Sequence, residues 1–171
     1  WVESSRAVAE SRADDAGRAA FRFEVPDDLG GAHEMRIEDG ETTKSGMHWI
    51  TPSAFALDVN SGPAGTPFKI HLKGVGWTET ANIYTVVYDN SYIGYACGFN
   101  SNGDVEIFLQ ATGEPGWHFI DLYPAIYRGT EPRPINFRIP QLNFADDHPG
   151  EDLPRFRFAF RVTNNEDRFG Q

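Results

Sequence analysis

The chain has a single cysteine among its 171 residues, Cys97, so it can form neither an intrachain disulfide nor a CxxC metal site. Its apolar runs are only a few residues long, against the roughly 20 residues that a bilayer requires. No basic segment followed by an apolar run opens the sequence, so we expect neither a membrane span nor a retained signal peptide. Basic residues are also scarce. A total of 15 Lys and Arg against 25 Asp and Glu gives a net charge of −10, which argues against nucleic acid as a partner.

Motifs for catalysis and cofactor binding are missing as well. The serines lack a G-x-S-x-G context, Cys97 lacks a Cys-His signature, and no GxGxxG or P-loop sequence occurs. The histidines show no H-x-H or H-E-x-x-H spacing. His33 and His118 each follow a glycine at the start of an expected strand, where we predict that the imidazole bonds a backbone group. We therefore expect no cofactor, and no enzymatic activity of the chain's own.

Turn residues and short alternating runs are abundant. The 17 glycines and 11 prolines separate aromatic and β-branched runs at intervals of about eight to twelve residues, as in a sandwich or barrel. Apolar residues recur at every second position, which predicts antiparallel strands with one buried face, in residues 21–25, 83–87, 105–109 and 156–160. The fold class predicted is all-β. Residues 2–20 are rich in Ala, Glu and Arg and leave a helix open as an alternative there.

The sequence also contains an internal repeat. Residues 16–37 resemble residues 102–122, about 85 residues further on, in the order Gly turn, strand, turn, Gly-x-His and alternating strand. A period of this length equals one small β-sandwich. We therefore expect immunoglobulin-like sandwiches in tandem, with the C-terminal half of one in residues 1–51 and a complete one in residues 52–140.

An incomplete sandwich exposes an apolar face and unpaired strand edges. Its missing strands must come from another protein chain, from a preceding segment, or from the C-terminal run. That run lies in residues 141–171, which we expect to form a tail with one docking strand that adds to the N-terminal half or to a neighbouring chain. Arg alternates with apolar residues there, and the predicted buried face consists of Phe156, Phe158, Phe160 and Val162.

A family resemblance supports the sandwich prediction. The turn Ser61-Gly62-Pro63-Ala64-Gly65-Thr66 is followed by Phe68, Ile70 and Leu72, and then by Gly74-Val75-Gly76-Trp77. This order resembles the opening of IPT/TIG-type immunoglobulin-like repeats of bacterial secreted and cell-surface proteins. The resemblance covers residues 52–140 well and residues 14–51 in part. It implies a spacer, adhesion or subunit-docking module that is secreted, periplasmic or on the cell surface.

Aromatic side chains crowd the region between Tyr84 and Phe99, and strand alternation predicts that about half of them point outward. Exposed Tyr and Trp rings can stack on a sugar or anchor a protein interface. Two alternatives to the structural module therefore stay open, a carbohydrate-binding module that uses this region and an accessory, non-catalytic domain or subunit of a secreted enzyme complex. The binding residues we predict are Trp77, Tyr88, Tyr92 and Tyr95.

One acidic cluster has the oxygen ligands that calcium prefers, namely Asp146, Asp147, Glu151 and Asp152. The cluster lacks the spacing of an EF-hand loop. We therefore expect a solvated turn there and no bound metal.

Overall fold

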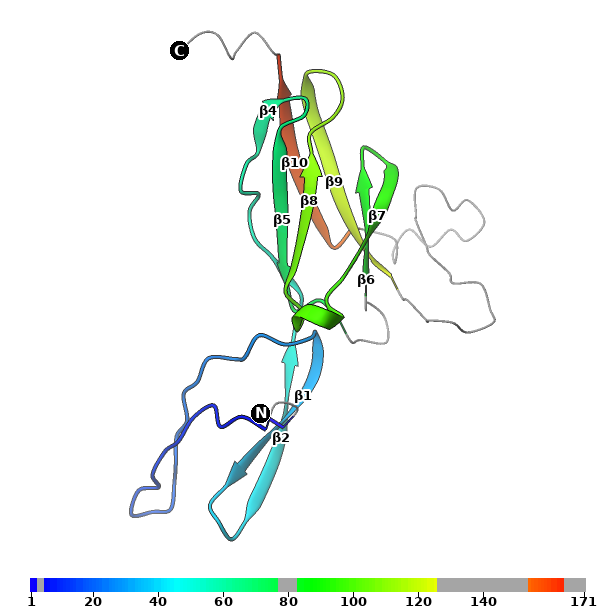
Figure 1. Ribbon diagram of the computed structural model, residues 1–171. Coiled ribbons are helices and arrows are strands. Elements are labelled where there is room, and N and C mark those ends of the chain that lie inside the picture. The colour runs from blue at the N-terminus through cyan, green and yellow to red at the C-terminus, as the bar shows by residue number, and fades with distance from the viewer. Residues whose placement is uncertain (3–4, 77–82, 126–153, 165–171) are drawn as a thin grey trace, which may run out of the picture.

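The computed structural model describes residues 1–2, 5–76, 83–125 and 154–164, and apart from one 3₁₀ helix the regular structure of these residues consists of β-strands (Figure 1). The predicted all-β class is confirmed, and the described part of residues 2–20 forms no helix. In chain order, the elements are β1 (Gly31–Glu38), β2 (Thr43–Ile50), β3 (Ser53–Ala54), β4 (Ser61–Pro63), β5 (Pro67–Lys73), β6 (Ile83–Tyr88), β7 (Ser91–Cys97), the 3₁₀ helix η1 (Phe99–Ser101), β8 (Val105–Gln110), β9 (Gly116–Ala125) and β10 (Phe156–Thr163).

Two of the three sheets face each other as a sandwich (Figure 1). One has the strand order β3-β5-β8 and the other β4-β10-β9-β6-β7. All neighbouring strands are antiparallel except β4 and β10, which are parallel. The order places β5 and β8 in one sheet and β6, β7, β9 and β10 in the other, which is how immunoglobulin-type sandwiches divide their strands.

The core lies between these two sheets, because alternate residues of each strand point inward. Phe68 of β5 and Phe160 of β10 stack across the sheets, with ring centroids 4.8 Å apart. Burial raises the pKa of Tyr84, another core residue, to about 12. Each large side chain buried here contributes about 1.5–3 kcal/mol. The other principal members of the core are Ile70, Leu72, Val86, Val105, Ile120, Leu122 and Val162.

The C-terminal strand forms as expected, but its partners differ from the expectation. β10 lies between β9 and β4 of the same chain, with Phe158 opposite Ile120 and Val162 opposite both Gly116 and Gly62. Its side chains Phe160 and Val162 are buried in the core, and Phe156 and Phe158 pack against it. The strand is thus the last strand of the main sandwich, because the edge of β9 and the core beneath it accept both its backbone and its apolar face. The expectation of a separate tail after residue 140, with a docking strand for the N-terminal half or another chain, is corrected accordingly.

The N-terminal segment also departs from the expectation. Residues 21–25 alternate as a strand would, yet they form no strand. The corresponding residues 105–109 of the second copy lie in β8, so the correspondence between the two copies fails at its first strand. What remains of the expected half sandwich is a two-stranded antiparallel sheet, β1-β2, in which Gly31 lies opposite Ile50.

Glycines allow residues 28–30 to approach the end of the sandwich closely. Gly103 has φ +79°, and a Cβ there would overlap the backbone oxygen of Asp28. A Cβ on Gly76 would lie 2.6 Å from Cδ2 of Leu29. The backbone contact at Gly103 is too close for any side chain, so the position of this segment depends on that glycine.

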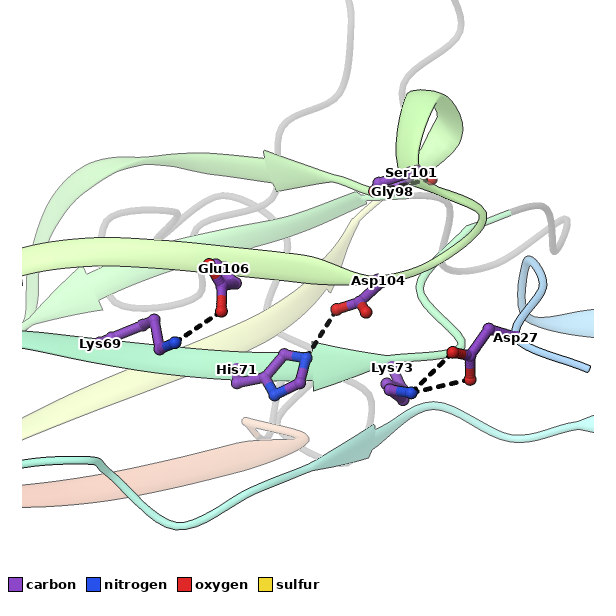
Figure 2. Close-up of polar contacts among 8 residues, drawn as sticks. All are labelled: Asp27, Lys69, His71, Lys73, Gly98, Ser101, Asp104 and Glu106. Carbon is purple, nitrogen blue, oxygen red and sulfur yellow. Dashed lines mark hydrogen bonds and ion pairs between the residues drawn. The ribbon is translucent and has the colours of Figure 1, made fainter.

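Three polar contacts lie along the outer side of β5, and the last of them reaches the junction, where residues 27–30 meet the end of the sandwich (Figure 2). Each exposed pair contributes little to stability, typically about 0–1 kcal/mol. The last pair nevertheless ties β5 to the N-terminal segment, since Asp27 belongs to that segment. The three pairs are Lys69–Glu106 at 2.6 Å, His71–Asp104 at 2.6 Å and Lys73–Asp27 at 2.8 Å.

The close approach at Gly103 can be tested against a matched glycine. Gly65 has φ +88° and no atom within 4 Å of an added Cβ. We expect Gly65→Ala to lower the free energy of unfolding by about 1–2 kcal/mol through the left-handed backbone alone. Gly103→Ala should cost about 1–3 kcal/mol more, because its methyl group also meets Asp28. Urea unfolding of both variants measures the difference, and equal losses would contradict the close contact.

Candidate functional site

The outer face of the five-stranded sheet brings polar and aromatic side chains into rows. In one row, Arg157 of β10 lies opposite Asp121 of β9, Asp121 opposite Val87 of β6, and Val87 opposite Tyr92 of β7. In the next row, Phe119 lies opposite Ala159. The rows follow from strand alternation, since the inward neighbours of these residues form the core.

An ion pair lies at the centre of this face. Nε and Nη2 of Arg157 donate to the two carboxylate oxygens of Asp121 at 2.7 and 2.8 Å. Asp121 is only 3% exposed, whereas 59% of the Arg157 side chain is exposed. The guanidinium carbon also lies 5.7 Å from the ring centroid of Phe119. A buried carboxylate held by a two-pronged donor fixes the guanidinium in one orientation toward solvent.

A tight turn places a second carboxylate beside this pair. Asp89 and Asn90, between β6 and β7, have φ of 46° and 62°, as expected for a two-residue hairpin turn. Oδ1 of Asp89 accepts a hydrogen bond from the backbone N–H of Phe119 at 2.9 Å. An open hollow of about 190 Å³ results, lined by Asp89, Asn90, Phe119, Asp121 and Arg157.

His118 supports the carboxylate of this turn from the inner side. Its Nδ1 lies 2.5 Å from Oδ2 of Asp89, and its Nε2 lies 2.8 Å from the backbone oxygen of Glu114. Both partners are acceptors, so only the protonated imidazolium satisfies both contacts. The hydrogen bond to Asp89 and then that to Glu114 raise the pKa of His118 above its ordinary value of 6.5. The predicted backbone bonds are confirmed for His118, and also for His33, whose Nε2 lies 2.6 Å from the Leu29 oxygen.

The predicted aromatic residues divide between the two faces of the sheet. Tyr92 and Tyr95 are 40% and 55% exposed on β7. Tyr88 is 8% exposed, and its hydroxyl donates to the backbone oxygen of Thr112 at 3.0 Å, so its placement in the binding surface is corrected. Trp77 and the acidic cluster of residues 146–152 lie outside the described residues.

Two exposed aromatic residues of the outer face were not singled out from the sequence. Trp117 and Phe119 of β9 are 62% and 46% exposed. Period-two alternation from Gly116 to Leu122 already marks a strand, and the same alternation puts both rings on the face opposite to Ile120. The alternation in the sequence therefore predicts that Trp117 and Phe119 share a face of the strand. It does not tell which of the two faces meets the core.

A second exposed surface lies on the β1-β2 sheet. Met47 and Trp49 of β2 point to the same face and are 65% and 62% exposed. On the other face, Trp1 stacks on His33 at 4.8 Å and donates from Nε1 to Asp28 at 2.8 Å. Within the described residues, β2 pairs only with β1, which leaves its outer edge without a strand partner.

The described side chains form no arrangement that we recognise as a catalytic or metal centre. No three His, Cys, Asp or Glu side chains of this part of the chain lie together in a way that could hold a metal ion. The pairs His71–Asp104 and His118–Asp89 have the geometry of a base and its orienting carboxylate, but no described Ser, Thr or Cys side chain hydrogen-bonds either ring. Cys97 is exposed and unpaired.

Three comparisons, with protein-family models, with curated proteins and with solved structures, found no match to this chain. Among the described residues, no helix has the length and apolar character to cross a bilayer.

The contact between His118 and Asp89 predicts a pH dependence. The folded-state pKa of His118 is raised, so its protonated ring stabilises the folded protein. This stabilisation is fully present below about pH 6.5 and is lost as the pH rises through the folded-state pKa. We expect NMR titration of the imidazole to give a pKa above 6.5 in the wild type and a lower value in Asp89→Asn. Asp104→Asn, which alters the pair with His71, is the control and should leave the titration of His118 unchanged. An identical pKa in Asp89→Asn and the wild type would contradict the assignment.

Proposed function

We propose that this protein is a non-catalytic interaction module of a larger secreted or cell-surface assembly. The sandwich serves as a rigid carrier, and the β1-β2 sheet docks onto another protein chain, which adds a strand to the free edge of β2. The observation that carries this proposal is the two-stranded sheet itself, with its exposed Met47 and Trp49.

A two-stranded sheet is only marginally stable in water, and a third strand is the usual means of stabilising it. The outer edge of β2 presents backbone N–H and C=O groups along Thr43–Ile50. An added strand would satisfy these groups and bring apolar side chains over Met47 and Trp49, which lie on one face. The partner we infer is therefore an extended segment of another chain with an alternating, apolar-faced sequence.

The junction supports the role of a rigid carrier. The close approach of Gly103 to Asp28 and the ion pair between Lys73 and Asp27 both connect the sandwich to the segment that leads into β1. A docking sheet attached in this way presents its edge at a fixed angle. Pre-organisation of this kind lowers the entropy cost of association.

The resemblance to IPT/TIG-type repeats is the basis for the proposed location and for the spacer or docking role. Three observations support it. Phe68, Ile70 and Leu72 face the core, Ser61–Pro63 forms a strand, and the immunoglobulin-type strand order closes the sandwich.

The docking role can be tested on the chain isolated under native conditions from the cells that encode it. We expect the wild type to elute in size-exclusion chromatography with light scattering at a mass well above its own 19.1 kDa. The double variant Met47→Ser/Trp49→Ser should shift toward the mass of the free chain, because the added strand loses its apolar contacts.

Phe108→Ser provides the matched control, since Phe108 is 74% exposed but lies on β8 of the sandwich. This variant should retain the large complex. A wild type that elutes alone, or a double variant that elutes like the wild type, would refute docking through β2.

A further inference from the structure

The hollow on the outer face of the five-stranded sheet has no part in the proposed docking. We propose that it is a binding site for one ring of a neutral carbohydrate, which the aromatic side chains contact through its C–H face and the polar side chains through its hydroxyl groups. The argument rests on three properties of the hollow, namely its donors and acceptors, its charge balance and its aromatic side.

The charged groups of the hollow are held by hydrogen bonds that use only part of their capacity. Arg157 donates two of its five N–H groups to Asp121, which leaves three for a ligand. The carboxylates of Asp89 and Asp121 retain lone pairs beyond their present bonds. Asn90 adds an amide that both donates and accepts. A sugar hydroxyl also donates and accepts at once, so this mixed set matches it.

The charges of the site balance. Asp89 and Asp121 are negative, Arg157 is positive, and His118 is positive when both of its ring nitrogens are hydrogen-bonded as observed. A phosphate or sulfate would meet two carboxylates, and a cation would meet a fixed guanidinium. With a net charge of −10 on the whole chain, the surroundings repel anions further. A neutral polyhydroxyl ligand is therefore favoured over either ion.

One aromatic ring, Phe119, borders the polar groups of the hollow, and Trp117 lies beyond it on the same strand. Phe119 is 46% exposed beside Arg157, and Trp117, two residues before it on the same face of β9, is 62% exposed. The residue opposite Phe119 on β10 is Ala159, whose small side chain leaves the space over the sheet open. The hollow of about 190 Å³ has room for one ring-sized group, and the exposed Trp117 could extend the contact to a neighbouring sugar unit.

The experiment titrates the full chain, labelled with ¹⁵N, against soluble neutral oligosaccharides of glucose, galactose, mannose, xylose and N-acetylglucosamine. Inorganic phosphate and an oligosaccharide of uronic acids serve as anionic comparators. We expect at least one neutral sugar to shift the amide signals of residues 89–90, 117–121 and 157. Binding that shifts signals elsewhere, no binding by any neutral sugar, or tighter binding of the anions would overturn the proposal.

Two variants test the named contacts. Phe119→Ala removes the aromatic wall, and Arg157→Lys keeps the charge but loses the two-pronged donor. Each should weaken binding about tenfold or more, which corresponds to the loss of one good contact. Phe108→Ala, on the outer side of the other sheet, should bind like the wild type. Equal affinity in all three variants would also overturn the proposal.

This site and the docking edge of β2 use different residues, so their tests fail independently. Loss of sugar binding in Phe119→Ala leaves the size-exclusion mass unaffected if docking occurs through β2. Shifts of residues 117–121 that depend on protein concentration and not on sugar would assign the face to a second copy of the chain, and would refute the carbohydrate site.

Discussion

The register between β9 and β10 is the constraint on which both the core and the outer face depend. Phe158 lies opposite Ile120, and its neighbour Arg157 lies opposite Asp121. Because side chains alternate between the faces of a strand, a slip of one residue would direct Arg157 toward the core and Phe158 toward solvent. Burial of Phe160 against Phe68 makes that slip costly. Hydrophobic packing on the inner side therefore fixes the ion pair on the outer side.

This constraint acts between segments that are distant in the sequence. About 30 residues separate the end of β9 from the start of β10. The entropy cost of closing a loop grows only slowly with its length, by about 0.6 kcal/mol for each doubling. A long connection before the last strand is therefore compatible with a stable sandwich, provided that the last strand buries enough apolar surface. The buried side chains Phe160 and Val162 supply that surface.

The strands that the sequence predicts correctly are those whose alternation also finds a partner. Residues 83–87, 105–109 and 156–160 lie in β6, β8 and β10, but the equally regular residues 21–25 form no strand. Alternation is a local property, whereas a strand requires the edge of another strand beside it. The same limit explains why β10 was expected to dock elsewhere, since nothing in residues 155–162 states which edge they pair with.

Side-chain contacts of the outer face were even less accessible to sequence reasoning. Arg157 and Asp121 are 36 positions apart, and their pairing follows only from the register. The tyrosines of β6 and β7 show a second difficulty. The turn at Asp89-Asn90 and the register shift after Val86 reset the alternation, so Tyr88 faces inward while Tyr92 faces outward. Exposure of aromatic residues could be predicted for the region, but not residue by residue.

The hollow and the β1-β2 sheet lie apart, because the hollow is beside the turn at one end of β7 and the sheet lies beyond the other end (Figure 1). β7 runs from the turn at Asp89-Asn90 to η1, whose flanking Gly103 contacts Asp28 at the junction with the β1-β2 sheet (Figure 1). A chain docked on β2 would therefore leave the hollow beside Asp89 open. With the contacts of Gly103 and Lys73 connecting the sheet to the sandwich, a partner bound at the sheet would also orient the outer face. In the proposed arrangement, the length of β7 would separate a bound sugar from the docked partner.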